Sequence, residues 1–294
     1  MKILLTGSSG FLGKVIREVL KGNEITTLSQ SNSDIKVNLI RQIPLLPNVN
    51  MIIHCAGKAH TVPKNNEEKQ LFFDVNVTGT SNLLTGLNNA QLPESFVFIS
   101  SVAVYGRETG ILINEDALLL AKDPYGKSKI EAEELIKTWC EANGVICTIL
   151  RLPLIADSNP PGNLQSMISA IKKGFYFNIA GGKAKKSIVM AKDVAAFIPF
   201  AAKNGGVYNL TDGYHPSFCE LSKLIAQQTS QKNIFNLPLP VAKLIALTGD
   251  LLGSKFPLNS NKLRKIISPL TFDDSKARKA LGWNPTQVLS GFVI

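Results

Sequence analysis

The sequence has little cysteine and little histidine. Its four cysteines, Cys55, Cys140, Cys147 and Cys219, form no CxxC pair, and its three histidines are scattered along the chain. Structural zinc sites and disulfide frameworks depend on closely spaced ligands of these two types. We therefore expect four reduced thiols and no metal site.

Long apolar runs and a leader-like N-terminus are also missing. The most apolar late stretch, 237–252, contains Pro240, Lys243 and Asp250 and is too short to span a bilayer. The chain starts directly with a strand-like run at residues 2–6, which leaves no room for the regions of a signal peptide. We expect a cytoplasmic protein without stable membrane insertion, in which 237–252 forms an amphipathic surface or lid helix.

Acidic residues are too few to balance the basic ones. The chain has 32 Lys and Arg but 22 Asp and Glu, so its net charge is +10. Such a charge fits a partner that is a nucleic acid, an anionic membrane or an anionic small substrate. The lysines cluster only briefly, at 183–186 and 262–265, and no aromatic residues interleave with them. Nucleic acid is therefore not expected as a partner, and charge alone does not choose between the other two.

Short apolar runs alternate with helical patterns through the first half of the chain. The runs at 2–6, 24–28, 51–54, 96–100 and 146–150 are of the buried type. The clearest helix pattern between them covers 128–142 and stops at Gly144. Such alternation predicts an α/β fold, a Rossmann doubly wound parallel sheet.

The character of the chain changes after the fifth apolar run. A stretch with Pro and Gly at 159–162 precedes a helix pattern over 164–173, and 207–210 again has the character of a sheet strand. We predict a dinucleotide-binding domain over 1–155, with a return strand near 188–210. Residues 156–294 are expected to form mainly a smaller, substrate-binding C-terminal lobe.

A glycine-rich loop follows the first candidate strand. In the motif TGSSGFLG, residues 6–13, glycines recur at intervals of three, and a helix pattern over 14–20 follows. Glycines here permit a tight turn, let backbone N–H groups approach a pyrophosphate and let the helix pack closely, while the helix N-terminus favours the anion. The strand before and the helix after distinguish the motif from an ordinary turn. The predicted dinucleotide loop consists of Gly7, Ser9, Gly10, Phe11, Leu12 and Gly13.

The second candidate strand lacks a carboxylate at its end. NAD-binding domains commonly place an acidic residue there, about 20 residues after the loop, to bind the adenosine ribose. Ser29 occupies this position, so nothing repels a 2′-phosphate, but no Arg stands nearby to bind one. We expect NAD, with NADP as the alternative. Ser29 can also simply cap a turn.

Tyr125 and Lys129 stand four residues apart in DPYGKSK, residues 123–129, on one face of a helix start. A tyrosine with its ordinary pKa of about 10 is a poor base at neutral pH, and a nearby ammonium with a cationic nicotinamide stabilises its phenolate. The strand at 96–100 leads into two hydroxyls at the edge where ligands bind such sheets, so Ser101 can hydrogen-bond the reacting oxygen. Ser100 can do so instead, or either hydroxyl can satisfy a loop. No GxSxG elbow offers a competing hydrolase site.

Several segments together resemble a known family. TGSSGFLG, HCAG at 54–57, NVTGT at 76–80, SSVAVYG at 100–106 and PYGKSK at 124–129 are similar, in order and spacing, to the extended short-chain dehydrogenases/reductases of the NAD-dependent epimerase/dehydratase family. GVYNL at 206–210 and DDSKARKALGW at 273–283 resemble late segments of UDP-galactose 4-epimerase relatives. The chain looks most like the branch from bacterial polysaccharide loci, which contains 4-epimerases and 4-ketoreductases of UDP-N-acetylhexosamines.

The resemblance implies a role for each matching position. Tyr125 becomes the acid/base, Lys129 binds the nicotinamide ribose, Ser101 assists at the sugar hydroxyl, and Asn76 orders the central helix. Further implied cofactor contacts are Ser29, Asn38, Leu39, Cys55, Ala56, Gly57, Asn76, Ser100 and Pro153. Implied substrate contacts, besides Ser101 and Tyr125, are Lys58, His60, Val102, Asn163, Lys186 and Arg264.

Two departures from the family pattern leave the reaction open. UDP-galactose epimerases typically have an Asn beside the Pro that follows the strand at 146–150, where it contacts the nucleotide diphosphate, whereas this chain has LPLI at 152–155. A basic residue of a later family motif has Lys186 as its counterpart here. A 4-epimerase acting by transient C4 oxidation is expected first, on UDP-glucose/galactose or a UDP-N-acetylhexosamine. The alternatives are an NAD(P)H-dependent reductase of a UDP-4-keto-6-deoxy-hexosamine and a non-catalytic dinucleotide sensor. The resemblance also implies a homodimer paired through 128–142 and the helix after Asn76.

Overall fold

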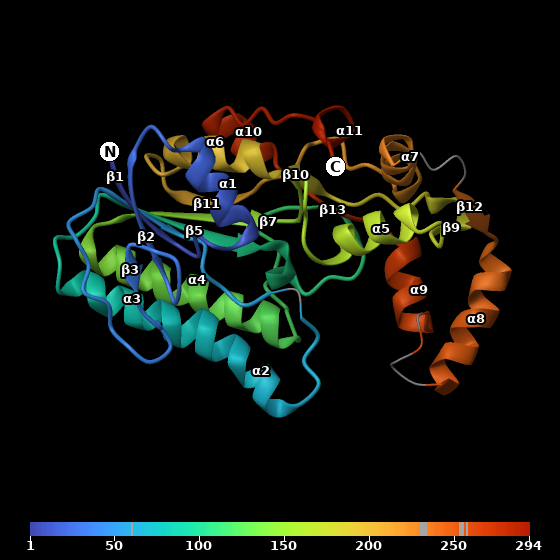
Figure 1. Ribbon diagram of the computed structural model, residues 1–294, viewed down its shortest axis with the longest axis horizontal. Helices are drawn as coiled ribbons and strands as arrows, with labels where there is room; N and C mark the ends of the chain where they lie inside the picture. Colours follow the sequence, from blue (N-terminus) through green and yellow to red (C-terminus); the bar gives the residue numbers. More distant parts are fainter. Residues whose placement is uncertain (60, 230–233, 253–255, 257) are drawn as a thin grey trace.

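The computed structural model describes residues 1–59, 61–229, 234–252, 256 and 258–294, and its centre is a seven-stranded sheet. The strand order is β11-β7-β5-β4-β1-β2-β3, and every neighbouring pair is parallel (Figure 1). The strands are β1 Lys2–Thr6, β2 Glu24–Ser29, β3 Ile35–Lys36, β4 Met51–His54, β5 Ser95–Ser101, β7 Ile146–Leu152 and β11 Gly206–Asn209. The predicted α/β fold with a parallel Rossmann-type sheet is confirmed.

Helices cover both faces of this sheet. On one face lie α1 Phe11–Val19, α6 Ala191–Ala201 and α10 Ser275–Leu281, and on the other α3 Gly79–Asn88 and α4 Pro124–Asn143 (Figure 1). Alternate strand residues enter the two cores: Ile3 and Leu5 belong to the first, Leu4 to the second. Because both sheet faces are buried, the strands appear in the sequence as continuous apolar runs.

The order of the strands reverses beside β1. The chain builds β2 and β3 on one side of β1 and then returns to place β4 on the other side. Ligands of open α/β sheets bind outside the carboxyl ends of the strands at such a switch point. The loops that leave β1 and β4 therefore lie together where a ligand is expected.

Three short parallel pairs lie outside the main sheet. They are β8 Leu154–Ala156 with β10 Ile188–Met190, β6 Gly110–Ile113 with β13 Leu270–Phe272, and β9 Phe177–Ile179 with β12 Phe235–Leu237. With β9 and β12, the helices α5 Gly162–Lys172, α7 Phe218–Gln228, α8 Leu239–Leu252 and α9 Ser260–Ile267 form what we call the C-terminal lobe (Figure 1). This lobe has apolar clusters of its own. The division of the chain at residue 155 stays a prediction.

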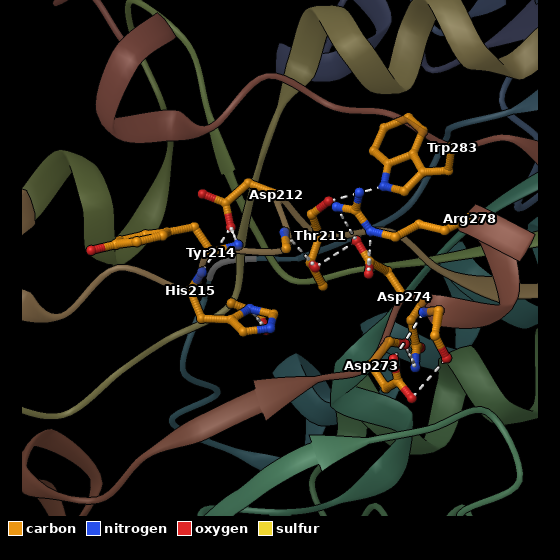
Figure 2. A network of polar contacts seen from close by, with 12 residues as sticks. Thr211, Asp212, Tyr214, His215, Asp273, Asp274, Arg278 and Trp283 are labelled. Atoms are coloured by element: carbon orange, nitrogen blue, oxygen red, sulfur yellow. Dashed lines mark hydrogen bonds and ion pairs between the residues drawn. The ribbon is translucent and has the colours of Figure 1, made fainter.

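A buried polar network attaches the last part of the chain to the end of β11 (Figure 2). The Asp274 carboxylate accepts hydrogen bonds from Thr211 Oγ1 at 3.0 Å and Arg278 Nε at 2.8 Å, and Trp283 Nε1 donates to the Thr211 carbonyl at 3.0 Å. The Asp212 carboxylate accepts from the backbone N–H groups of His215 and, at the start of α11 Val288–Gly291, of Val288. The C-terminal segment thus closes over the sheet edge.

Two helix starts differ from the prediction. α1 begins at Phe11 rather than at 14, and α4 begins at Pro124 rather than at 128. In α4, Asp123 accepts the Gly126 N–H at 3.0 Å and Pro124 takes the first helical position, which are ordinary start signals. In α1, tertiary packing of the glycine-rich turn outweighs the low helix propensity of glycine. The five expected strands agree with the structure to within two residues at each end.

Candidate active site

The glycine-rich loop brings three chain segments into contact. Gly7 has φ +69°, and a Cβ there would lie 2.6 Å from the Ala56 nitrogen in the loop after β4. A Cβ on Gly13 would lie 2.1 Å from the Gly7 carbonyl oxygen. Gly10 caps α1 without a side-chain hydrogen bond, so no capping side chain competes for the N–H groups of the first turn. The loop therefore has the close backbone approach and the free donors that suit a pyrophosphate.

Asn76 lies in a π-helical turn, Asp74–Thr78, between α2 Asn66–Phe73 and α3. Its buried side chain accepts the Lys58 N–H at 2.7 Å and donates to the Ser128 hydroxyl of α4 at 2.9 Å. A Cβ on Gly57 would lie 3.1 Å from Asn76 Oδ1 and 3.3 Å from Lys129 Nζ. Asn76 thus fixes the loop after β4 against α4, and π-turns of this kind are frequent at functional sites.

Tyr125 lies in the first turn of α4, with its ring 6.2 Å from that of Phe72. Burial raises the pKa of Tyr125, and a hydrogen bond with the Ser101 side chain partly offsets this. We expected the Lys129 ammonium to stabilise the phenolate, but Lys129 is not among the groups that lower this pKa. A tyrosine and a hydroxyl partner, two of the groups that an acid/base site needs, therefore lie together at the carboxyl end of β5.

Lys129 is buried one turn further along α4. Its Nζ donates to the Ile99 carbonyl of β5 at 2.9 Å and lies 4.4 Å from the centre of the Phe98 ring. Burial lowers the pKa of Lys129 to about 8, while the negative charges that Cys55 and Glu133 can carry oppose this shift. Lys129 therefore sits between the loop after β4 and the end of β5, at the carboxyl edge of the sheet, where ligands bind in open α/β folds.

The pair of serines at the end of β5 is divided between two tasks. Ser100 is buried and donates to Glu133 Oε1 at 2.5 Å, whereas Ser101 is half-buried, accepts the Ala103 N–H at 3.2 Å and bonds Tyr125. The structure thus brings Ser101, and not Ser100, to the tyrosine.

Sequence reasoning missed a buried ion pair behind these residues. Arg151 Nη2 lies 2.7 Å from Glu133 Oε2, and Arg151 Nη1 donates to the Tyr105 hydroxyl at 3.1 Å. Both charged side chains are almost fully buried. The available signal was an arginine inside an otherwise apolar strand, because a buried charge requires a partner. The pair joins α4 to β7 one turn beyond Lys129.

The predicted diphosphate contacts Lys186 and Arg264 meet at α9. Lys186 Nζ donates to the Lys265 carbonyl at 2.9 Å, and burial lowers the Lys186 pKa. Arg264 is exposed and pairs with Glu108 at 2.8 Å, and Lys265 pairs with the same carboxylate at 3.2 Å. Glu108 follows Ser101 by seven residues, so this basic cluster approaches the segment that leaves β5.

Other predicted positions have local roles in the structure. The Ser29 hydroxyl bonds the Ser31 carbonyl, as a turn cap would, and the Asn38 side chain accepts the Ile40 N–H at 3.0 Å. Leu12 packs in the sheet core, so only its backbone is available to a ligand. Asn163 is exposed on α5.

The remaining positions lie as follows: Ser9 is exposed in the glycine loop, Phe11 opens α1, Leu39 packs beside α3, Cys55 follows β4, Val102 follows β5, and Pro153 separates β7 from β8. His60 lies outside the described residues.

Comparison with known proteins gives one family match and several full-length relatives. The model of the NAD dependent epimerase/dehydratase family matches residues 3–211. The chain is 27% identical to a UDP-glucose 4-epimerase of Vibrio cholerae, covering 98% of this chain and 92% of that one. It is also 27% identical to an N-acetyl-alpha-D-glucosaminyl-diphospho-ditrans,octacis-undecaprenol 4-epimerase of Escherichia coli O157:H7, covering 95% and 89%. A GDP-6-deoxy-D-mannose reductase of Pseudomonas aeruginosa is 26% identical over 76% of this chain and 79% of its own.

Solved structures share the fold over nearly the whole chain. A UDP-N-acetylglucosamine 4-epimerase from Bacillus cereus superposes with a TM-score of 0.74 at 22% identity, covering 99% of this chain and 93% of that one. A Thermus thermophilus UDP-glucose 4-epimerase in complex with NAD gives 0.72 at 21% identity, covering 97% and 94%. RMD from Pseudomonas aeruginosa with NADPH gives 0.72 at 22% identity, covering 98% and 94%.

Proposed function

The chain belongs to the NAD dependent epimerase/dehydratase family, and from this premise we propose that it is a nucleotide-sugar 4-epimerase. UDP-glucose/galactose or a UDP-N-acetylhexosamine is the proposed substrate. The main support is that Tyr125 and Lys129 lie one turn apart in α4, with Lys129 Nζ bonded to the Ile99 carbonyl of β5 and Ser101 beside Tyr125. Relatives named as 4-epimerases over nearly the whole chain add to it.

The family is NAD(P)-dependent, and the residues present suit a dinucleotide. The loop from Gly7 to Gly13 would hold the pyrophosphate, and Gly57, Asn76 and Lys129 would surround the nicotinamide ribose. When bound, the nicotinamide supplies reversible two-electron oxidation at C4 of the sugar.

Proton transfer falls to Tyr125. Burial raises the pKa of Tyr125, so its phenol must first ionise; the phenolate oxygen then takes the proton of the sugar C4 hydroxyl during oxidation and returns it when the 4-keto sugar is reduced on its other face. The Ser101 hydroxyl, held beside Tyr125, orients the reacting oxygen. The Lys129 ammonium adds positive charge nearby, and Lys186 with Arg264 would meet the diphosphate.

The proposal is tested by counting bound dinucleotide and by assaying epimerisation. The protein is denatured, the released dinucleotide is identified and counted per subunit, and UDP-galactose and UDP-N-acetylgalactosamine are then offered. An epimerase regenerates its cofactor, so about one NAD per subunit and conversion without added cofactor are expected.

Tyr125→Phe should lower kcat by roughly 10²–10⁴-fold without releasing the dinucleotide. Tyr214→Phe, at an exposed tyrosine, is the matched control. Full activity of Tyr125→Phe would refute the role of Tyr125.

A reductase is the second candidate. The absence of a carboxylate at Ser29 leaves room for the 2′-phosphate of NADPH, and one relative is named as a GDP-6-deoxy-D-mannose reductase. Net reduction consumes its cofactor, so little dinucleotide would copurify, and NADPH would bind more tightly than NADH. That outcome would redirect the assays to UDP-4-keto-6-deoxy-hexosamines.

A further inference from the structure

The outer side of α8 is apolar and exposed. The helix packs against α9 through small residues: Ala242, Ala246 and Gly249 are buried, and the first two share a cluster with Leu263. Its other side consists of large apolar residues that none of the described elements covers. These are Val241, Leu244, Leu247, Leu251 and Leu252, with exposed fractions from 42% to 89%.

These residues form a continuous stripe. Leu244, Leu247 and Leu251 follow one another at i, i+3 and i+7, which places them on one face of a helix. A helix of 14 residues is about 21 Å long, so the stripe runs along most of that length. Surface leucines that occur singly need no explanation, but a contiguous apolar patch marks an interaction site.

Aromatic residues next to α8 enlarge the apolar surface. β12 leads directly into α8 and pairs with β9, where Phe235 lies opposite Phe177 with ring centres 6.3 Å apart. Both rings are largely exposed, as is Phe175 just before β9. β9, β12 and α8 occupy the same end of the molecule, farthest from the main sheet (Figure 1).

The net charge is confined to the same half of the chain. Residues 1–155 contain 15 Lys and Arg and 15 Asp and Glu, whereas residues 156–294 contain 17 and 7. The whole excess of +10 therefore belongs to 156–294. Between Lys223 and Lys265 Asp250 is the single acidic residue, and its carboxylate is engaged by Ser260.

We propose that the outer face of α8, which lies in the positively charged part of the chain, docks on an anionic phospholipid membrane. An apolar helix face in a cationic part of a protein lies in the interface of a bilayer, with its leucines among the acyl chains, while the positive charge of the protein is attracted to the lipid phosphates. Among the described residues, no helix is long and apolar enough to cross a membrane, so the contact is peripheral. A second copy of this chain fits the face less well, because two lobes of strong positive charge would repel each other.

The test is sedimentation with vesicles. The full chain is mixed with vesicles of phosphatidylglycerol and phosphatidylcholine, or of phosphatidylcholine alone, at low and high salt. We expect binding to the anionic vesicles that weakens with salt, and little binding to the neutral ones. The triple variant Leu244→Glu/Leu247→Glu/Leu251→Glu should bind anionic vesicles more than about tenfold more weakly, because three apolar side chains no longer enter the interface.

The double variant Leu45→Glu/Leu118→Glu is the matched control, since both leucines are strongly exposed but lie outside the C-terminal lobe. It should bind like the wild type. Equal binding of the triple variant, equal binding to neutral vesicles, or no binding of the wild type would each overturn the proposal. A triple variant that changes the oligomeric state, with no vesicle binding by the wild type, would assign the face to a second copy.

Discussion

At the scale of single residues, burial controls the chemistry of the candidate site. Tyr125 and Lys129 are both shifted toward their neutral forms, because the surrounding protein disfavours either charge. His54 behaves in the same way: its pKa is lowered to about 3, and its ring nitrogens bond Thr6 and Thr80 at 2.6 and 2.9 Å. His54 is thus a neutral structural residue beneath the site rather than a proton donor.

The pH dependence of turnover follows from Lys129. Its pKa of about 8 means that the ammonium loses its proton as the pH rises through that value. If the charge assists Tyr125, kcat/KM should fall above about pH 8. Glu133→Gln removes a negative charge that raises this pKa, so the falling limb should move to lower pH. Glu134→Gln, at the exposed neighbour, should leave the limb in place. A kcat/KM profile that stays flat beyond pH 9, roughly one unit above this value, would refute the role of the ammonium.

At the scale of elements, the junction between β1 and α1 depends on close backbone contact. Gly13→Ala would place a methyl group 2.1 Å from the Gly7 carbonyl oxygen, so α1 must move away from the strand. We expect at least a tenfold loss of dinucleotide affinity, measured by titration calorimetry, and a lower Tm. Gly22→Ala is the control, since nothing lies within 4 Å of its added Cβ. Unchanged affinity in Gly13→Ala would show that the loop does not hold the pyrophosphate.

The join between α4 and β7 depends on the buried pair of Glu133 and Arg151. Removing one partner leaves an uncompensated buried charge, so Arg151→Met should lower the free energy of unfolding by about 3–5 kcal/mol. Combining it with Glu133→Leu should recover much of that loss, because no buried charge then remains. Glu134→Gln, in an exposed pair with Lys137, should cost less than about 1 kcal/mol. Urea unfolding of the wild type and these three variants checks this, and a double variant no more stable than Arg151→Met would contradict it.

At the scale of the whole molecule, we propose that two copies pair through α3 and α4. Both helices cover the same face of the sheet, and Trp139 of α4 donates to Asn88 of α3 at 2.7 Å, so they form one rigid surface. Analytical ultracentrifugation should show a dimer. Ser81→Arg, at an exposed position of α3, should shift it toward monomer, whereas Leu247→Glu on α8 should not. The reverse pattern would place the interface on the C-terminal lobe.

The two ends of the molecule differ in net charge and in how well their apolar surfaces are covered. The sheet half is neutral overall and is closed by the Asp274 network, while the C-terminal lobe carries the positive charge and an uncovered apolar helix. The fold separates the proposed active site, at the carboxyl edge of the sheet, from any surface contact made by α8, which lies at the far end of the molecule (Figure 1).

The sequence by itself determined the parallel sheet, because strands buried on both faces must be continuous apolar runs, as in β1 and β4. It also determined the glycine loop, since the positive φ of Gly7 favours glycine and the close contacts at Gly7 and Gly13 leave no room for a Cβ. Both features depend on residues that are close together in the sequence, so a short stretch of sequence is enough to predict them.

Only the tertiary structure decided which hydroxyl meets Tyr125, which partner neutralises Arg151 and which side of 237–252 stays uncovered. Ser100 and Ser101 are equivalent in sequence, and they differ because Ser100 reaches Glu133 near the middle of α4, whereas Ser101 lies beside Tyr125 in the first turn of the same helix. Residues far apart in the chain, such as Lys186 and Lys265, meet only when the lobes pack. These choices depend on non-local contacts, and no short stretch of sequence contains them.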